Sequence, residues 1–231
     1  MQTRCPYASC LHITDVAEED EFKHINCPNC ARIFSARSLP RHLEIDKQTE
    51  KHRSNLTLAD LHFQQEGEDF GQMVVILEEI RSLWNVGSIF RSADGSGFSH
   101  LFLIGITGCP PRREIAKTSL GAEDHVGWSY SGNSLPVVQA LKERGYQIVG
   151  LEKTAESSGL TAGLQKNLLR KPLCLIVGSE TKGIYAETLA ECEIVLDLPM
   201  RGFKESLNVA VAFGIAAYAI SENLEQACGN G

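Results

Sequence analysis

The C-terminal two-thirds of the chain alternates short apolar runs with segments of helical periodicity. The apolar runs that predict strands cover residues 73–80, 101–105, 146–151, 173–177 and 194–198, and helices are expected over 88–96, 135–144 and 205–223. This alternation is typical of an α/β fold in which helices cover both faces of a parallel sheet. In such sheets ligands bind beyond the carboxyl ends of the strands, so the segments that follow the strands are the first candidates for a site.

Composition and length set the limits on organisation. With 231 residues, 43% of them hydrophobic, the chain suffices for one substantial domain and a small appendage. We expect a small domain over 1–45, a polar linker over 46–71 and the main domain over 72–231. The longest apolar stretch, 209–220, is interrupted by Gly214 and is shorter than the roughly 20 residues of a membrane span. The N-terminus lacks the order of a secretory signal, so a cytoplasmic location without disulfides is expected.

Four of the eight cysteines fall within the first 30 residues, with the spacing C-x4-C-x16-C-x2-C. Cysteine thiolates at two short knuckles suit tetrahedral zinc, and a segment too small for its own core gains stability from a metal. We therefore predict a zinc-ribbon-like domain with a structural zinc held by Cys5, Cys10, Cys27 and Cys30. The first gap is wider than the usual two residues, His12 and His24 are possible substitute ligands, and free thiols are the alternative. Cys174 and Cys192 lie among apolar residues and are expected to be small core residues.

Residues 32–53 carry six Lys/Arg against three Asp/Glu, in a chain whose formal net charge is -7. That net charge argues against indiscriminate coating of nucleic acid, because such binding rests on many phosphate contacts. The local excess of positive charge is typical either of a surface that faces nucleic acid or of a solvated linker. Both interpretations remain open at this point.

A first polar motif, 84–94, follows the first predicted strand and reads WNVGSIFRSAD. Asn85 and Gly87 suit a turn, and Ser88 suits the cap of the helix that follows. Arg91 would then lie in the first turns of that helix. It is either a functional cation or an ordinary surface arginine.

A second motif follows the run 173–177 and reads GSETKG over residues 178–183. Gly178 and Gly183 flank Glu180, and glycines allow a backbone to approach a ligand closely. This pattern favours a binding loop, although Glu180 could be a neighbour of a helix N-cap without further role. Neither this motif, nor 84–94, nor the third motif described next contains a Gly-x-Gly-x-x-Gly or a Gly-Lys-Ser/Thr sequence. This disfavours an ordinary dinucleotide or ATP site.

The third motif, 196–212, reads LDLPMRGFKESLNVAVA, so a strand ends at a proline and a helix of small residues begins near Ser206. Backbone N–H groups at such a helix start are available to a ligand. Asn208 would lie inside the first turn, where asparagine is a poor helix former, and its presence indicates a specific role.

The three motifs in this order, with the segment KTSLGAE over 117–123, resemble those of the SpoU (TrmH-like) branch of the SPOUT RNA methyltransferases. The resemblance spans roughly 72–222 and leaves out the N-terminal cysteines. It implies a six-stranded parallel sheet with a deep trefoil knot and a homodimer. It also implies transfer of a methyl group from S-adenosylmethionine to a ribose 2'-hydroxyl of tRNA or rRNA.

The resemblance also implies the site residues. Arg91 would have the central catalytic role, with Asn85, Glu180, Ser206 and Asn208 in support. The cofactor would be bound by Leu151, Thr154, Gly178, Glu180, Gly183, Leu198, Met200, Ser206 and Leu207. Because an arginine stays protonated, we interpret Arg91 as a cation that binds phosphate and stabilises a developing alkoxide, in preference to a general base.

Two alternatives remain open from the sequence. Some relatives with this fold methylate a base nitrogen instead of a ribose. A catalytically inactive RNA-binding protein with a zinc ribbon is the alternative from another class, although intact Arg91, Glu180, Ser206 and Asn208 argue against it.

Overall fold

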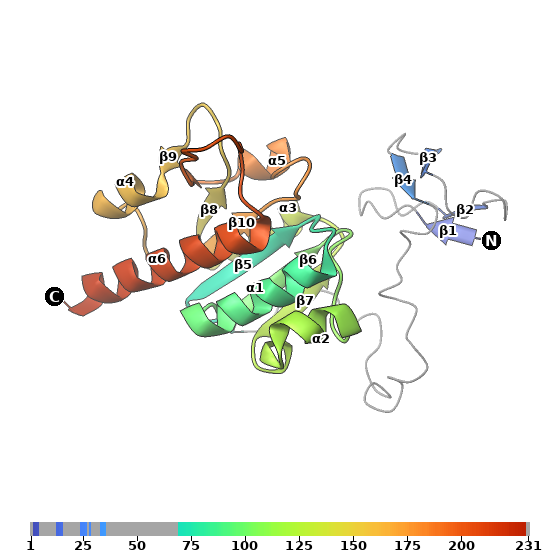
Figure 1. Cartoon of the computed structure of the whole chain (residues 1–231), viewed down its shortest axis with the longest axis horizontal. Helices are drawn as coiled ribbons and strands as arrows, with labels where there is room; N and C mark the ends of the chain where they lie inside the picture. The colour runs from blue at the N-terminus through green and yellow to red at the C-terminus, as the bar shows by residue number, and fades with distance from the viewer. Residues whose placement is uncertain are drawn as a thin grey trace.

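The computed structural model describes residues 69–229, with side chains to 226, and before them only Pro28 and four short strands. Strand β1 (Gln2–Arg4) pairs antiparallel with β2 (Ile13–Asp15), and β3 (His24–Asn26) pairs antiparallel with β4 (Ile33–Ser35) (Figure 1). The four cysteines predicted as zinc ligands lie outside the described residues. The zinc and the domain boundaries therefore stay predictions.

Seven parallel strands form the main sheet, in the order β7-β6-β5-β10-β8-β11-β9. Their bounds are β5 Met73–Glu78, β6 His100–Ile104, β7 Gly127–Ser131, β8 Gln147–Leu151, β9 Ser158–Gly159, β10 Leu173–Val177 and β11 Ile194–Asp197. The expected number of six strands is wrong, because the two-residue β9 pairs with the end of β11. Since β10 inserts between β5 and β8, the segments after β5 and β10 begin side by side.

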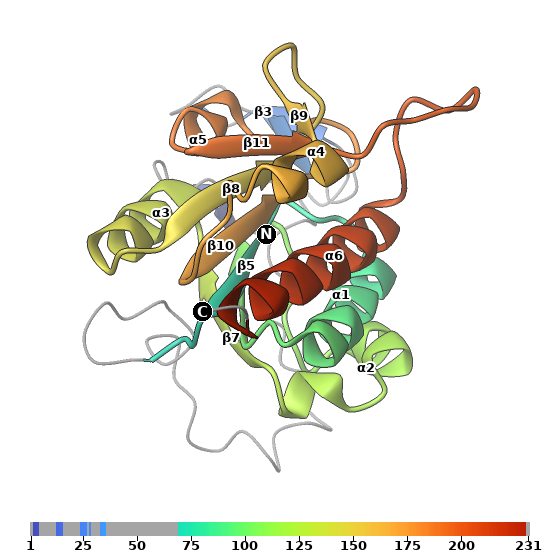
Figure 2. The same ribbon diagram turned by 90° about the vertical axis from the view of Figure 1, so that its left-hand side faces the viewer.

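Helices cover both faces of the sheet (Figure 2). One face carries α1 (Leu83–Ser96), α2 (Arg113–Ser119), α4 (Leu160–Gln165) and α6 (Val209–Gly229), and the other carries α3 (Ser134–Glu143) and α5 (Ala186–Leu189). A short 3-10 helix, Ala122–Asp124, precedes β7. This arrangement confirms the predicted α/β fold with helices on both faces.

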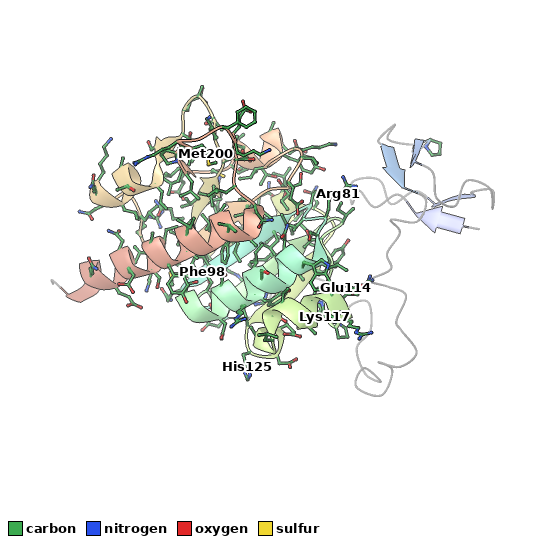
Figure 3. The ribbon with its side chains drawn as sticks, in the orientation of Figure 1. Arg81, Phe98, Glu114, Lys117, His125 and Met200 are labelled. Atoms are coloured by element: carbon green, nitrogen blue, oxygen red, sulfur yellow. The ribbon has the colours of Figure 1, made fainter. Side chains whose placement is uncertain are left out.

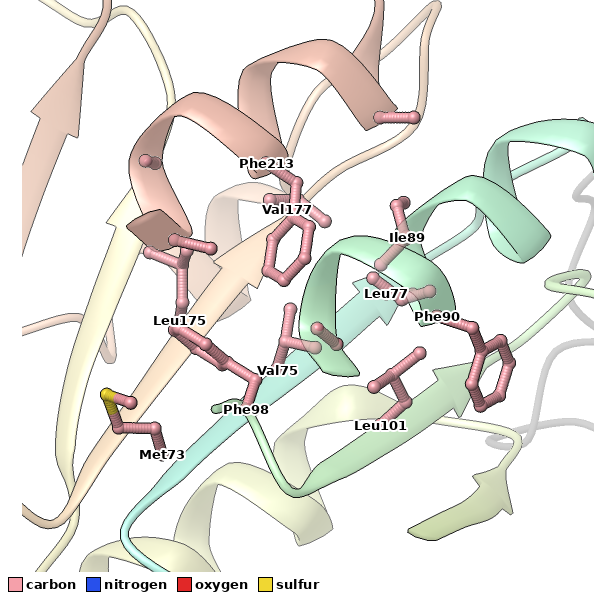
Figure 4. Packing of buried hydrophobic residues seen from close by; sticks show 14 of the residues in the cluster. Met73, Val75, Leu77, Ile89, Phe90, Phe98, Leu101, Leu175, Val177 and Phe213 are labelled. Carbon is pink, nitrogen blue, oxygen red and sulfur yellow. The ribbon is translucent and has the colours of Figure 1, made fainter. Parts of the chain in front are cut away.

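The central strands are buried on both faces, which is why they read as continuous apolar runs. Val75 and Leu77 of β5 pack with Phe213 of α6 on one face (Figure 4), while Val74 and Ile76 join the cluster beneath α3 on the other. Among the described helices, none combines the length and the apolar character that crossing a membrane requires. The strand order does not by itself define how the chain threads, so the trefoil knot stays a prediction.

Helix α1 begins at Leu83, five residues before the predicted start at 88. Ser82 is its N-cap, and its hydroxyl accepts from the backbone N–H of Asn85 at 3.4 Å. Asn85 and Gly87 therefore lie inside the helix, so the predicted turn and the predicted cap at Ser88 are wrong. A Cβ at Gly87 would lie 2.1 Å from Thr118 Oγ1 and 2.3 Å from the carbonyl oxygen of Ile115. The glycine is required there for close packing of α2 on α1.

Candidate functional site

A cleft of about 510 Å³ lies at the carboxyl ends of β8, β10 and β11, beside the start of α6. Its volume is within the range of about 300–1,000 Å³ that is usual for ligand sites. The lining residues are Leu151–Lys153, Val177–Gly183, Asp197, Leu198, Glu205–Val209 and Ala212. Most residues predicted to bind a cofactor are among them. Thr154 and Met200 are not, and Met200 lies on the loop between β11 and α6 (Figure 3).

The loop 178–183 forms one wall of this cleft and is closed on itself. The N–H of Ser179 donates to the carbonyl of Gly183 at 3.1 Å, and the N–H of Gly183 donates back at 2.9 Å. A Cβ at Gly178 would lie 2.1 Å from the carbonyl carbon of Gly183, and Gly183 itself has φ +68°. Both glycines are therefore required by the shape of the loop.

Glu152, which also lines the cleft, anchors the end of this loop. Its Oε2 accepts from the N–H of Ile184 at 3.0 Å, which ties the end of the loop to the residue that follows β8. Glu152 is not among the residues predicted from the sequence. Its position directly after a predicted strand was the signal that could have found it.

A chain of hydrogen bonds joins one side chain from each of the three motifs. Asn208 Nδ2 donates to Asn85 Oδ1 at 3.1 Å, and Asn85 Nδ2 donates to Glu180 Oε1 at 2.8 Å. The second carboxylate oxygen of Glu180 accepts from the N–H of Arg81 at 3.3 Å. The structure thus brings together three of the residues predicted as catalytic. Glu180 and Asn208 also line the cleft.

Asn208 is the cap of α6 and does not lie inside its first turn. The helix begins at Val209, and Asn208 Oδ1 accepts from the N–H of Ala210 at 3.0 Å and of Val211 at 3.3 Å. The predicted helix start near 205 is therefore wrong. One amide group serves two purposes, because its oxygen caps α6 while its nitrogen donates to Asn85.

We expect the Asn208→Ala variant to lose about 0.5–2 kcal/mol in free energy of unfolding, measured by urea titration, because α6 loses its cap. Asn208→Ser is the matched control. Its hydroxyl oxygen can still accept from the first helical N–H groups, while the donor to Asn85 is removed without adding a charge, so its stability should stay closer to that of the unchanged protein. Equal destabilisation of both variants would contradict the capping role.

Ser206 lines the cleft, whereas Arg91 does not. Arg91 lies on the exposed face of α1, and it makes no hydrogen bond or ion pair with any other residue that the structure describes. Its guanidinium can therefore contact a molecule that arrives from solution. Like Asn85, Thr154 and Met200, Arg91 is therefore a predicted site residue that does not line the cleft.

Carboxylates outnumber cations in the lining of the cleft. The lining contains four carboxylates, Glu152, Glu180, Asp197 and Glu205, and two lysines, Lys153 and Lys182. Asp197 also accepts from the hydroxyl of Ser157 at 2.7 Å. A negative lining suits a ligand with positive charge.

Cys174 and Cys192 are not suited to act as nucleophiles. Burial raises the pKa of the Cys174 thiol, and it raises the pKa of Cys192 to about 12, so both stay protonated near neutral pH. Cys174 lies in the core cluster and Cys192 packs against it, as predicted. Among the described residues, no group of three or more His, Cys, Asp or Glu side chains is arranged to hold a metal ion.

The part of the chain that contains the three motifs is similar to known proteins. Residues 72–218 match the SpoU rRNA Methylase family. A putative TrmH family tRNA/rRNA methyltransferase, YacO, of Bacillus subtilis is 32% identical over 169 residues, which cover 71% of this chain and 64% of that protein. The 23S rRNA (guanosine-2'-O-)-methyltransferase RlmB of Nitrosomonas europaea is 27% identical over 95% of this chain and 81% of its own length. Against several such relatives the chain spans about three fifths of their length.

Solved structures show the same fold. The AdoMet-bound rRNA methyltransferase of Sinorhizobium meliloti superposes with a TM-score of 0.61 at 27% identity, covering 73% of this chain and 61% of that one. The TrmH/SpoU tRNA modifying enzyme of A. aeolicus superposes with a TM-score of 0.59 at 25% identity, covering 68% and 77%.

Proposed function

This chain belongs to the SpoU rRNA Methylase family, and on that premise we propose that it transfers a methyl group from S-adenosylmethionine to a ribose 2'-hydroxyl of tRNA or rRNA. The observation that carries the proposal is the hydrogen-bonded chain Asn208–Asn85–Glu180 at the edge of the cleft. These three residues come from three different motifs, which lie on different elements and far apart in the sequence.

The cleft fits S-adenosylmethionine in size, backbone and charge. The loop 178–183 begins with Gly178, which has no side chain, so its backbone can approach the cofactor closely. The carboxylates of the lining complement the sulfonium and ammonium groups of the cofactor. Leu151, Leu198, Ser206 and Leu207 line the cleft as well and would contact the cofactor. When bound, the cofactor would supply an electrophilic methyl group and leave as S-adenosylhomocysteine, while the proton of the ribose hydroxyl passes to solvent.

The residues of the chain would act mainly by positioning. Asn85 and Asn208 hold the starts of α1 and α6 against the loop of Glu180, which fixes the cleft relative to the exposed face of α1. Alignment of the ribose oxygen with the methyl carbon can account for several kcal/mol of the barrier, up to about 7–11 kcal/mol in well-oriented systems. Arg91 would bind a phosphate of the RNA and stabilise the negative charge that develops on the ribose oxygen.

The choice of ribose as the acceptor rests on a relative. RlmB of Nitrosomonas europaea is named for guanosine-2'-O methylation, which supports ribose over a base nitrogen as the methyl acceptor.

Incubation of RNA with the chain and labelled cofactor, followed by nucleoside analysis, tests this proposal. We expect a label in 2'-O-methylated nucleosides; a label in a base would favour the base-nitrogen alternative. Failure to bind S-adenosylmethionine by calorimetry would favour the inactive RNA-binding alternative.

We also propose that Cys5, Cys10, Cys27 and Cys30 hold a structural zinc. Each pair of cysteines falls in sequence between two strands that pair antiparallel, β1 with β2 and β3 with β4, which is the order a ribbon requires. Metal analysis of the purified full chain should find one zinc per chain. The double variant Cys27→Ser, Cys30→Ser should lose it.

A homodimer is the state of assembly that we propose. Val211, Ile215 and Tyr218 occur at positions i, i+4 and i+7 of α6, and about half of each residue's surface is exposed. An apolar stripe of this kind on a helix is typical of a covered surface. Ile215→Lys should therefore shift the sedimentation of the chain from dimer to monomer.

A further inference from the structure

Trp84 leaves 48% of its surface exposed immediately beside the site. It lies in the first turn of α1 and directly precedes Asn85, which is bonded to Glu180 and Asn208. Its carbonyl accepts from the hydroxyl of Ser88 at 2.9 Å and from that of Thr118 in α2 at 3.1 Å. The residue is therefore held by two helices while its indole faces outward. None of the hydrogen bonds of the site uses this ring.

A cation lies over the exposed ring. Lys117 Nζ is 5.4 Å from the centroid of the Trp84 ring, within the range of a cation–π contact. Gly87 makes this possible, because its lack of a side chain lets α2 pack directly on α1. Aromatic and positively charged groups are thus placed together by the packing of the two helices.

The stretch of sequence that contains Trp84 carries more positive than negative side chains, although the chain as a whole is negative. Residues 81–118 contain five Lys/Arg against two Asp/Glu, while the formal net charge of the chain is -7. The five are Arg81, Arg91, Arg112, Arg113 and Lys117. Figure 3 shows Arg81 and Lys117 on the same side of the molecule, together with Glu114, which pairs with Arg112 at 3.9 Å. This charge suits an anionic partner, in contrast to the uncharged stripe Val211, Ile215 and Tyr218 on α6.

Trp84 and Arg91 share one face of α1. They are seven residues apart, with Ser88 between them at i+4, so the indole and the guanidinium lie two turns apart, about 10 Å along the helix axis. A short stretch of single-stranded RNA can contact both. A phosphate at Arg91 would leave a neighbouring base within reach of the indole.

We propose that Trp84 is a stacking platform for an unpaired nucleobase close to the ribose that receives the methyl group. This inference rests on the proposed function, because it takes RNA as the substrate. Sequence-specific and single-strand recognition of RNA commonly uses aromatic side chains as stacking surfaces, with cations at the backbone. Trp84, Lys117 and Arg91 supply these two kinds of group beside the cleft.

The fluorescence of Trp84 itself gives a direct test. The chain has two tryptophans, and the other, Trp128, is partly buried against the core. In the full-length Trp128→Phe variant, titration with a short single-stranded oligoadenylate should quench the emission of Trp84. The Trp84→Ala variant should bind the same probe about 5- to 150-fold more weakly, the loss expected for one stacked base. Trp84→Phe should retain most of the affinity, because a smaller ring still stacks.

Leu168→Ala is the matched control, since Leu168 is also an exposed apolar residue, at 39%, and also has cations near it in sequence (Lys166, Arg170 and Lys171), but it has no aromatic ring. It should leave oligoadenylate binding unchanged. Unquenched Trp84 emission, or equal affinity of Trp84→Ala and the unchanged chain, would overturn the proposal. A shift of Trp84 emission with protein concentration in the absence of RNA would also overturn it, because a second copy of the chain would then cover the ring.

Calorimetry with S-adenosylmethionine separates this inference from the proposed function. Trp84→Ala should bind the cofactor with unchanged affinity, since Trp84 does not line the cleft. If the unchanged chain binds no cofactor and methylates no RNA while oligoadenylate still quenches Trp84, the proposed function fails and the stacking site stands. If cofactor binding and methylation are intact but quenching is absent, the stacking site alone fails.

Discussion

The Arg91→Ala variant should transfer methyl groups about 100- to 1,000-fold more slowly than the unchanged protein, the loss typical of removing one group that stabilises developing charge. Its affinity for S-adenosylmethionine should stay the same, because Arg91 lies on the exposed face of α1 outside the cleft. Single-turnover rates with tRNA or rRNA and calorimetry with the cofactor measure the two effects separately. Arg91→Lys should recover only part of the rate, since lysine keeps the charge but not the planar fork of donors.

Arg170→Ala provides the control for loss of a surface arginine. The side chain of Arg170 is 54% exposed and forms an ion pair with Glu193 at 3.2 Å, away from the cleft. An exposed pair of this kind contributes little, so rate and cofactor affinity should both be retained. Full activity of Arg91→Ala would refute the catalytic assignment. A parallel loss of cofactor affinity would show that Arg91 acts on the fold of the cleft instead.

The Gly178→Ala variant should lose about 10- to 100-fold or more in affinity for S-adenosylmethionine, because overpacking against an ordered neighbour costs about 1–3 kcal/mol or more. The new Cβ would meet the carbonyl carbon of Gly183 at 2.1 Å, the nitrogen of Ile184 at 2.2 Å and the oxygen of Gly183 at 2.4 Å. All three are backbone atoms, so no side-chain rotation can relieve the contact. The loop must open, and the wall of the cleft opens with it. Calorimetric titration measures the loss.

Gly159→Ala is the matched glycine control. Its Cβ would meet only the side chain of Pro199 at 3.5 Å, an ordinary van der Waals distance. Cofactor affinity should therefore change little. If Gly178→Ala bound the cofactor as well as Gly159→Ala does, the loop 178–183 would not form the cofactor wall. Circular dichroism of both variants checks that the sheet is intact.

The strands of the sheet were predictable where both of their faces are buried. The run 173–177 coincides with β10, and β5, β6, β8 and β11 lie within two residues of the predicted ends. The strands β7 and β9 were missed. Both lie at the edges of the sheet, where a strand has fewer buried neighbours, and the sequence of β7 is mostly polar or glycine.

The helix starts were less predictable, for a tertiary reason. Gly87 looks like a turn residue, but the close approach of α2 requires a glycine inside α1. Asn208 looks misplaced within a helix, but it caps α6 and donates to Asn85. In both cases the residue type is explained by a contact with a distant part of the chain. Local helix propensity carries no information about such contacts.

By itself the sequence determined the parallel α/β class, the three motifs and the glycines of the binding loop, because apolar periodicity and residue type are local properties. The tertiary structure alone decided that β10 lies between β5 and β8, and this order brings Asn85 to Glu180 and Asn208 across 95 and 123 residues of chain. It also decided that Arg91 faces solvent outside the cleft, on the same face of α1 as Trp84. Contacts between such distant residues depend on which strands become neighbours, and no short stretch of sequence encodes that choice.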